Sequence, residues 1–398
     1  KIRIKYYKGG YEMNFLQELG VLLKKNIREY GMYIALGAIM IIFTILTDGL
    51  FFSSRNISNL FNQMGYIAVL AVGMTLVIVI RHIDLSVGFM AGFLGAIAAR
   101  MLREGMPVIP TILIVIALGT VFGLVNGFWV AKVGLPAFVA TLAGMLIFRG
   151  ALLLFTQSTG TIIVMNDSFN QIGNGFIPDI FHNENVHILT LIIGLAIIGL
   201  YIYSEIKTRN NKLRYNFEVL SMRMFILKLL FISAIIFYIF WTLASYNGLS
   251  WTFVITLIIT FVYHVLTTKT VLGRHIYAVG GNPEAARLSG IDVKKITLFV
   301  FGSMGFLTAI SGILYTSRLQ SATPDAGTLF ELDAIAAAYV GGVSAAGGVG
   351  KVANSLIGAL VMASLINGMN LLGVGISLQY VIRGAVLIAA VVFDIKTR

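Results

Sequence analysis

The chain has 398 residues, of which 58% are hydrophobic and 12% are charged, and its mean hydropathy is +0.90. This composition excludes an ordinary soluble domain. The net charge of +12 does not indicate a nucleic-acid partner, because the sequence lacks a soluble basic surface interleaved with aromatic residues. Cysteine is absent, so disulfide bonds and thiolate metal sites are excluded as well.

Long apolar runs alternate with short polar stretches along the chain. In a lipid bilayer every backbone N–H and C=O group must be paired within the protein, which favours helices as the spanning structure. A membrane barrel would show short segments of alternating hydrophobicity, and the sequence has none. We therefore predict an all-α fold, a polytopic bundle of transmembrane helices.

A helix needs about 20 apolar residues to cross the bilayer, and the sequence offers about 10 to 12 such spans. Twelve candidates lie near 32–52, 62–81, 85–100, 108–131, 134–155, 187–204, 228–247, 250–268, 296–317, 332–350, 352–370 and 378–395. An even number of spans places both ends of the chain on the same side of the membrane.

The basic residues are concentrated in a few of the polar stretches. Seven Lys and Arg lie in residues 1–31, six in 207–228, five in 269–295 and two at the C-terminus, whereas 156–187 has none. Cytoplasmic loops carry the excess of Lys and Arg. We therefore predict that both termini and the basic stretches face the cytoplasm, and that 156–187 and 318–331 face the opposite side.

Two of the candidate spans are weak. The runs 62–81 and 85–100 are separated only by Arg81-His82-Ile83-Asp84, and the run 332–350 is short and contains two Gly-Gly pairs. Transporters often have discontinuous helices at such places, so we predict a break at each. A faint similarity between Asp84-Leu-Ser-Val-Gly and Gly342-Val-Ser-Ala-Ala-Gly hints at an internal repeat.

Glycines at four-residue spacing occur in the run 108–131. Gly119, Gly123 and Gly127 would form one small-residue stripe, which allows two helices to approach closely. Packing within one chain explains the stripe most simply, and a dimer contact is the alternative.

The stretch from Gly280 to Asp292 has the start and stop signals of a short helix. Asn282 precedes Pro283 and Glu284, and Gly290 follows the end, which is the order expected of an N-cap, a first turn and a residue beyond the C-cap. A helix of about two turns is too short and too polar to span. We expect it to lie along the membrane face. Its consecutive alanines have small side chains, so another protein could dock closely there.

These residues match a known family. Glu284-Ala-Ala, three residues and Gly290 resemble the coupling helix of ATP-binding-cassette importer permeases, although an ordinary capped loop helix is the plainer alternative. The resemblance extends to "LAVGMTLVIVIRHIDLSVG" at 70–88, "LPAFVATLAGMLIFRG" at 135–150, "ELDAIAAAYVGGVSAAGGVG" at 331–350 and "GALVMASLINGMNLLGVGI" at 358–376. These strings are similar to the ribose/xylose/galactose-type permeases, and most of all to the xylose-like branch. The charged pair Arg81-His82 departs from the pattern.

The resemblance implies a function. The chain would be the permease subunit of an importer for monosaccharides, xylose or a related pentose or hexose, in the bacterial cytoplasmic membrane. Its partners would be a second copy of itself, two ATP-binding subunits that hold ATP and Mg, and an extracytoplasmic sugar-binding protein. The residues implied for the coupling helix are Asn282, Pro283, Glu284, Ala285, Ala286, Arg287 and Gly290.

The resemblance also implies a domain plan. After the cytoplasmic segment 1–31, residues 32–398 would form a single transmembrane permease domain. The xylose-like branch carries an extra helix pair, here 187–247 with the basic linker 205–228. The coupling loop would be 269–295.

Polar residues inside the spans are costly and tend to face cavities or partners. We select Asp84, Ser86, Asn367 and Asn370 as candidate residues of the translocation pathway. Simpler roles compete with this one, because Asp84 can cap the following helix and the asparagines can bond across helices. Arg149, Asp333 and Arg383 are further ionisable residues in or near the spans. For Arg149 we expect a side chain that reaches the membrane interface.

The sequence contains no motif for ATP hydrolysis or other catalysis. The glycine-rich stretch 341–352 fails as a phosphate loop, because Ala345 occupies the first glycine position and Val352 replaces the hydroxyl residue. The five histidines are scattered, and no catalytic set or metal cluster is evident. We therefore predict a non-enzymatic subunit without a cofactor or metal of its own. The alternatives are an ion-coupled secondary transporter and a permease of the same type for amino acids or nucleosides.

Overall fold

The computed structural model describes residues 27–181, 186–217 and 219–396. The basic stretch 1–26 and Arg398, which entered the charge argument, lie outside the described residues. The chain divides into two compact units, and residues 176–249 make up most of the first. The second comprises Gly31–Phe52, Asn59–Gly175 and Ser250–Arg398.

The first unit is a helical hairpin. It contains α8 (Ile188–Arg214) and α9 (Met222–Ala244), which pack against each other where Gly194 meets Phe240. Lys228 and Glu205 form an ion pair of 2.9 Å between the two helices. Because α8 continues to Arg214, much of the predicted linker 205–228 is helical rather than irregular. The assignment of 187–247 as an extra pair on a permease domain stays a prediction.

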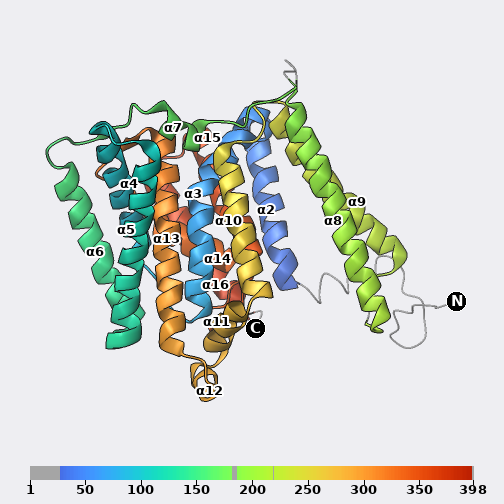
Figure 1. The fold of residues 1–398 in the computed structure, drawn as a ribbon. Helices are drawn as coiled ribbons and strands as arrows, with labels where there is room; N and C mark the ends of the chain where they lie inside the picture. Colours follow the sequence, from blue (N-terminus) through green and yellow to red (C-terminus); the bar gives the residue numbers. More distant parts are fainter. Residues whose placement is uncertain (1–26, 182–185, 218, 397–398) are drawn as a thin grey trace. The chain divides into compact units, whose positions relative to one another are not determined.

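The second unit is a bundle of helices (Figure 1). Its first half contains α2 (Ile27–Leu46), η1 (Leu50–Phe52), α3 (Ser54–Val79), α4 (Val87–Arg103), α5 (Val108–Phe128), the π-helix η2 (Trp129–Val133), α6 (Ala137–Thr156) and α7 (Asp167–Asn174). Its second half contains α10 (Trp251–Lys269), α11 (Val271–Gly281), α12 (Pro283–Leu288), α13 (Val293–Leu319), α14 (Phe330–Val340), α15 (Val352–Leu371) and α16 (Ile376–Lys396).

Each of the twelve predicted runs contains a helix. Among the described residues, nine helices are long and apolar enough to cross a membrane, and the remaining three runs form α2, α4 and α14. The helix α14 has only 11 residues, since it ends at Gly341 and the left-handed Gly342 (φ +85°) follows. The predicted polytopic helical bundle is confirmed, and so are the two breaks, at residues 80–86 and 341–351.

Glycines allow α5 and α13 to touch at backbone distance. A Cβ atom on Gly123 would lie 2.3 Å from the carbonyl oxygen of Phe301, and one on Gly305 would lie 2.1 Å from that of Gly119. Gly127 also faces Phe301. The predicted glycine stripe therefore packs within the chain, which is the simpler of the two explanations given for it.

Two distant loops meet at one end of this unit. The strand β1 (Ile162–Ile163) pairs antiparallel with β2 (Ser321–Ala322). Close by, the Ser317 hydroxyl accepts a hydrogen bond of 2.6 Å from the Gly173 N–H. The stretches 156–187 and 318–331 were predicted to share one side of the membrane, and this contact agrees with that prediction.

Burial separates an inner layer of helices from an outer one. The helices α3, α13 and α15 are largely buried, with Met74, Phe301 and Met304 fully enclosed. By contrast, α5, α6 and α16 present apolar side chains outward. Ile109 of α5 is 72% exposed and Ile388 of α16 is 68% exposed. Exposed apolar surface of this extent is what contact with lipid requires.

Candidate functional site

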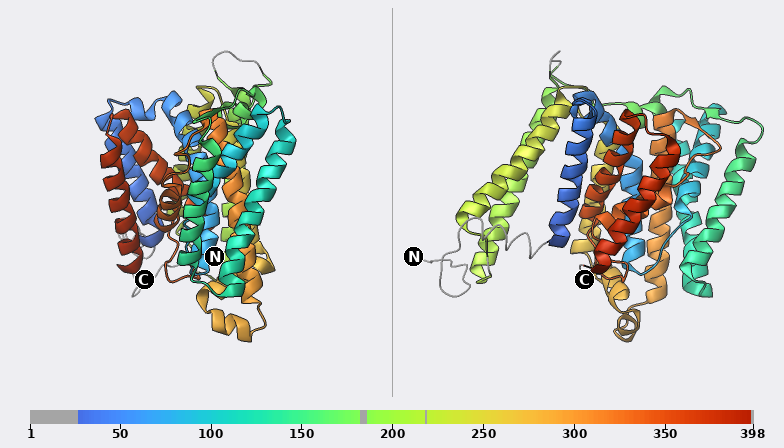
Figure 2. Two further views of the ribbon diagram at one scale, coloured as in Figure 1. Left: turned by 90° about the vertical axis from the view of Figure 1, so that its left-hand side faces the viewer. Right: turned by 180° about the vertical axis from the view of Figure 1, so that it is seen from behind.

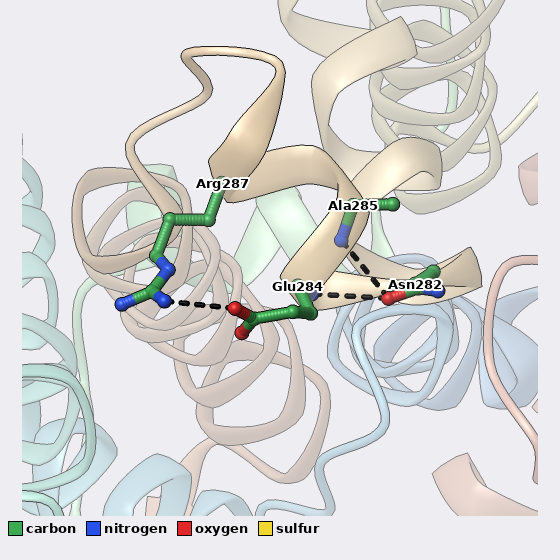
Figure 3. Close-up of polar contacts among 4 residues, drawn as sticks. All are labelled: Asn282, Glu284, Ala285 and Arg287. Atoms are coloured by element: carbon green, nitrogen blue, oxygen red, sulfur yellow. Dashed lines mark hydrogen bonds and ion pairs between the residues drawn. The ribbon is translucent and has the colours of Figure 1, made fainter.

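The short helix α12 is built by its own caps (Figure 3). The Asn282 side chain accepts hydrogen bonds of 3.1 Å from the N–H groups of Glu284 and Ala285. Pro283 occupies the first turn, where its missing N–H costs nothing. Gly290 follows the end with φ +84°, and its N–H donates to the Arg287 carbonyl. The helix predicted over 283–289 is thus present, and it ends at Leu288.

The exposed face of α12 differs from the predicted one in a single respect. Ala286 is buried, whereas Ala285 is exposed, so only one of the two alanines contributes to the surface. Glu284 and Arg287 form an exposed ion pair of 2.8 Å, and Leu288 is 80% exposed. In each view α12 extends beyond the ends of the neighbouring helices of its unit (Figures 1 and 2).

Arg81 binds the end of the helix that leads into α12. Its Nε donates 2.7 Å to the Gly280 carbonyl and its Nη2 donates to the Gly281 carbonyl. These are the last carbonyls of α11, where the helix dipole favours a cation. Asn282 comes next and is both the C-cap of α11 and the N-cap of α12. Arg81 itself has φ +65°, which is uncommon for a residue with a side chain.

The second break meets the first at the same point. The Gly348 N–H donates 2.8 Å to the Val79 carbonyl at the end of α3. The Tyr277 hydroxyl of α11 donates 2.5 Å to the Gly350 carbonyl. A Cβ atom on Gly280 would lie 1.9 Å from the Val79 carbonyl oxygen, so only glycine fits there. The ends of α3 and α11 and the segment 341–351 therefore form one contiguous junction, which we call the break junction.

Asp84 and Ser86 lie in the interior next to the first break. The Asp84 Oδ1 accepts from the Ser86 N–H at 2.9 Å and from the Ser86 hydroxyl at 2.6 Å. Asn126 of α5 donates 2.8 Å to the Ser86 hydroxyl. The cap residue of α4 is Ser86 rather than Asp84. The Asp84 Oδ2 is buried without a hydrogen-bond partner among the described residues.

Asn367 and Asn370 lie in the last turns of α15, in a different part of the unit. Asn367 is buried. The Asn370 Oδ1 accepts 2.9 Å from the Gln379 side chain of α16, so it supports the turn between the two helices. The structure therefore does not bring the four candidate pathway residues together. Asp84 pairs with Ser86, and the asparagines form a separate pair of positions.

The remaining ionisable residues in or near the spans are held by specific partners. Arg383 of α16 pairs with Asp333 of α14 at 3.3 Å, and Glu331 shares the first turn of α14 with Asp333. Arg149 lies over the Phe89 ring at 4.8 Å from its centroid. This is a cation–π contact, and the interface position expected of the exposed Arg149 stays a prediction.

Two groups of residues escaped the sequence analysis. Arg81 was noted only as a departure from the family pattern, because nothing near it in sequence shows that its partners are Gly280 and Gly281. An aromatic group, Tyr66, Tyr315 and Phe330, comes from three helices, with ring centroids 4.8 to 5.1 Å apart. Inspection of one span at a time could not have found it.

The described residues hold no group of three or more His, Cys, Asp or Glu that is able to bind a metal. The break junction is made of backbone groups, glycines, the Arg81 guanidinium and the Tyr277 hydroxyl.

Comparison with known proteins finds similarity to permease components of transport systems. A family model described as the permease component of branched-chain amino acid transport systems matches residues 56–391. The xylose transport system permease protein of Haemophilus influenzae is 40% identical over 94% of this chain and 97% of that protein. The corresponding xylose permease of Escherichia coli K12 is 39% identical over 94% of this chain and 93% of its own length.

The ribose import permease protein of Haemophilus influenzae is 34% identical over 92% of this chain and 93% of that protein. No solved structure matches the chain. Since the family model spans most of the sequence and these permeases align along nearly their whole length, the chain belongs to the family of transport-system permease components.

Proposed function

We propose that this chain is the membrane subunit of an ATP-driven importer of monosaccharides, with xylose or a related pentose or hexose as solute. The observation that carries the proposal is the 39–40% identity to xylose permeases over 94% of the chain. Two copies would form the membrane part, with two ATP-binding subunits on the α12 side and a sugar-binding protein on the opposite side. Both termini and α12 would then face the cytoplasm.

The geometry of α12 supports docking of an ATP-binding subunit there. A partner needs an element that protrudes, keeps its shape alone and transmits force, and α12 is capped at its start and joined directly to α11 and α13. Its exposed Leu288 supplies an apolar contact, and Glu284 and Arg287 supply charges of both signs. ATP and Mg would be held by the partner.

The break junction supplies a route from α12 to the spans. Movement of α12 displaces Asn282 and with it the Gly280 and Gly281 carbonyls that Arg81 binds. Arg81 lies at the start of the first break, and the Gly348 N–H joins the second break to the end of α3 by its hydrogen bond to the Val79 carbonyl. We infer that Arg81 is a positioning residue that makes both discontinuous helices respond to one docking event.

The proposed function is tested by uptake. The chain is reconstituted in liposomes with its ATP-binding subunit and its binding protein. The liposomes should accumulate labelled xylose only when ATP is present on the membrane side that α12 faces. Excess unlabelled arabinose, galactose, glucose and leucine identify the solute class by competition. ATP-independent uptake driven by an ion gradient would support a secondary transporter, and competition by leucine alone would support an amino-acid permease.

The docking role of α12 is tested at Gly290. We expect Gly290→Asp to reduce uptake at least about tenfold and to abolish stimulation of the ATPase by the loaded binding protein. Gly105→Asp is the matched control, because Gly105 has φ +90° and equally open surroundings, so its backbone strain of about 1 kcal/mol is the same. Glu284→Ala should act in the same direction as Gly290→Asp. Full stimulated ATPase and uptake in Gly290→Asp would reject the docking role.

The positioning role of Arg81 predicts a change in uptake per ATP hydrolysed. Arg81→Ala removes two hydrogen bonds from a charged group, each contributing about 1.5–3 kcal/mol, and should lower this ratio at least about tenfold. Arg81→Lys keeps one donor and should restore part of it. Arg100→Ala removes an exposed ion pair to Glu104 and a contact with the Phe155 ring, neither of which belongs to the break junction, and serves as control. An unchanged ratio in assembled Arg81→Ala complexes contradicts the role.

For the solute route we propose that Asp84, Ser86, Asn367 and Asn370 offer polar contacts. Asn367→Ala and Asp84→Asn should each lower uptake about fivefold, the effect of one lost hydrogen bond of about 1 kcal/mol. Thr308→Val is the control, because the buried Thr308 hydroxyl bonds only within its own helix, to the Met304 carbonyl at 2.8 Å. Normal uptake at normal membrane levels removes the substituted residue from the route.

A further inference from the structure

A cavity of about 570 Å³ lies where four elements of the second unit meet. Its walls come from residues 81–83 after α3, from η2 and the turn behind it, and from the first turns of α6 and α13. The π-helix η2 and the left-handed Gly134 (φ +85°) interrupt the passage from α5 to α6. Such π-helical turns are frequent at functional sites.

The polar part of the cavity is cationic. Its cations are Arg81 and Lys294, the imidazole of His82 lines it as well, and none of the lining residues is acidic. The carboxylate next to this wall, Asp292, is engaged elsewhere, because it accepts 3.0 Å from the Lys295 N–H and lies 3.5 Å from the Lys295 ammonium. A cavity with this set of groups is suited to an anion.

The other part of the cavity is apolar and open to the outside of the bundle. Leu135 is 39% exposed and Phe138 is 56% exposed, and both line the cavity together with Val130 and Pro136. A small hydrated anion gains nothing from such a wall. A molecule with a charged head and a hydrocarbon chain uses both parts, and basic pockets between helices on the cytoplasmic side are suited to anionic lipid head groups.

We propose that this cavity binds the phosphate head group of an anionic phospholipid of the cytoplasmic leaflet, with the start of an acyl chain along Leu135 and Phe138. The choice of leaflet rests on the proposed function, which puts α12 in the cytoplasm. Arg81 lines the cavity and also binds the last carbonyls of α11. The bound lipid therefore lies beside the connection that positions α12.

The experiment measures lipid binding and does not depend on transport. The purified full chain in detergent is titrated with phosphatidylglycerol or phosphatidylcholine, and bound lipid is counted by native mass spectrometry. We expect clear preference for phosphatidylglycerol in the unchanged protein and a loss of at least about fivefold in Lys294→Glu. Lys269→Glu, on an exposed basic residue in the last turn of α10 that does not line the cavity, is the control and should retain binding.

Four results would overturn the proposal. Equal retention of both lipids would remove the anion preference, and equal losses in Lys294→Glu and Lys269→Glu would indicate only general surface charge. Displacement of phosphatidylglycerol by millimolar inorganic phosphate would identify a free anion as the ligand. A photocrosslinker at position 294 that captures the ATP-binding subunit in the assembled complex would identify the cavity as a protein contact. Failure of xylose uptake, by contrast, leaves the lipid measurement unaffected.

Discussion

The hydrogen bond from the Gly348 N–H to the Val79 carbonyl joins the two interruptions of the helical bundle. Within hydrocarbon an unpaired backbone group costs several kcal/mol, so a helix that stops early must find partners for its last carbonyls. Here the end of α3 is satisfied by the segment behind α14, and the end of α11 is satisfied by Arg81. The second interruption thus supplies a hydrogen-bond donor at the place where the first one begins.

Glycine makes this mutual pairing possible. Gly280, Gly347 and Gly348 bring three backbone segments to distances at which a Cβ atom would overlap a carbonyl or amide. The same device operates between α5 and α13 at Gly123 and Gly305. Because packing in a membrane gains little from the hydrophobic effect between helices, close backbone contact and hydrogen bonds hold such bundles together. A bundle held in this way is able to shift at its glycine contacts without exposing a core.

Local signals in the sequence were sufficient for the spanning helices and for α12, whereas α7 and α11 lie in stretches that were expected to be loops. Hydrophobic run length predicted all twelve, and the order Asn282-Pro283-Glu284 with Gly290 predicted α12 because caps act within four residues. The partners of Arg81 were beyond prediction, since Gly280 lies 199 residues away in sequence. The same limit applies to the Asp84–Ser86–Asn126 chain and to the Asp333–Arg383 pair, whose members come from different helices.

The helix α12 is attached closely to the two helices that flank it. Asn282 is shared with α11, and only residues 289–292 separate α12 from α13, whose N-cap is Asp292. With joints this short, α12 does not move without moving the end of α11 and the start of α13. The long helix α13 packs on α4 and α5, so displacement reaches the first half of the unit directly. Under the proposed function, an ATP-binding subunit that closes against α12 would act on both halves of this unit through these short joints.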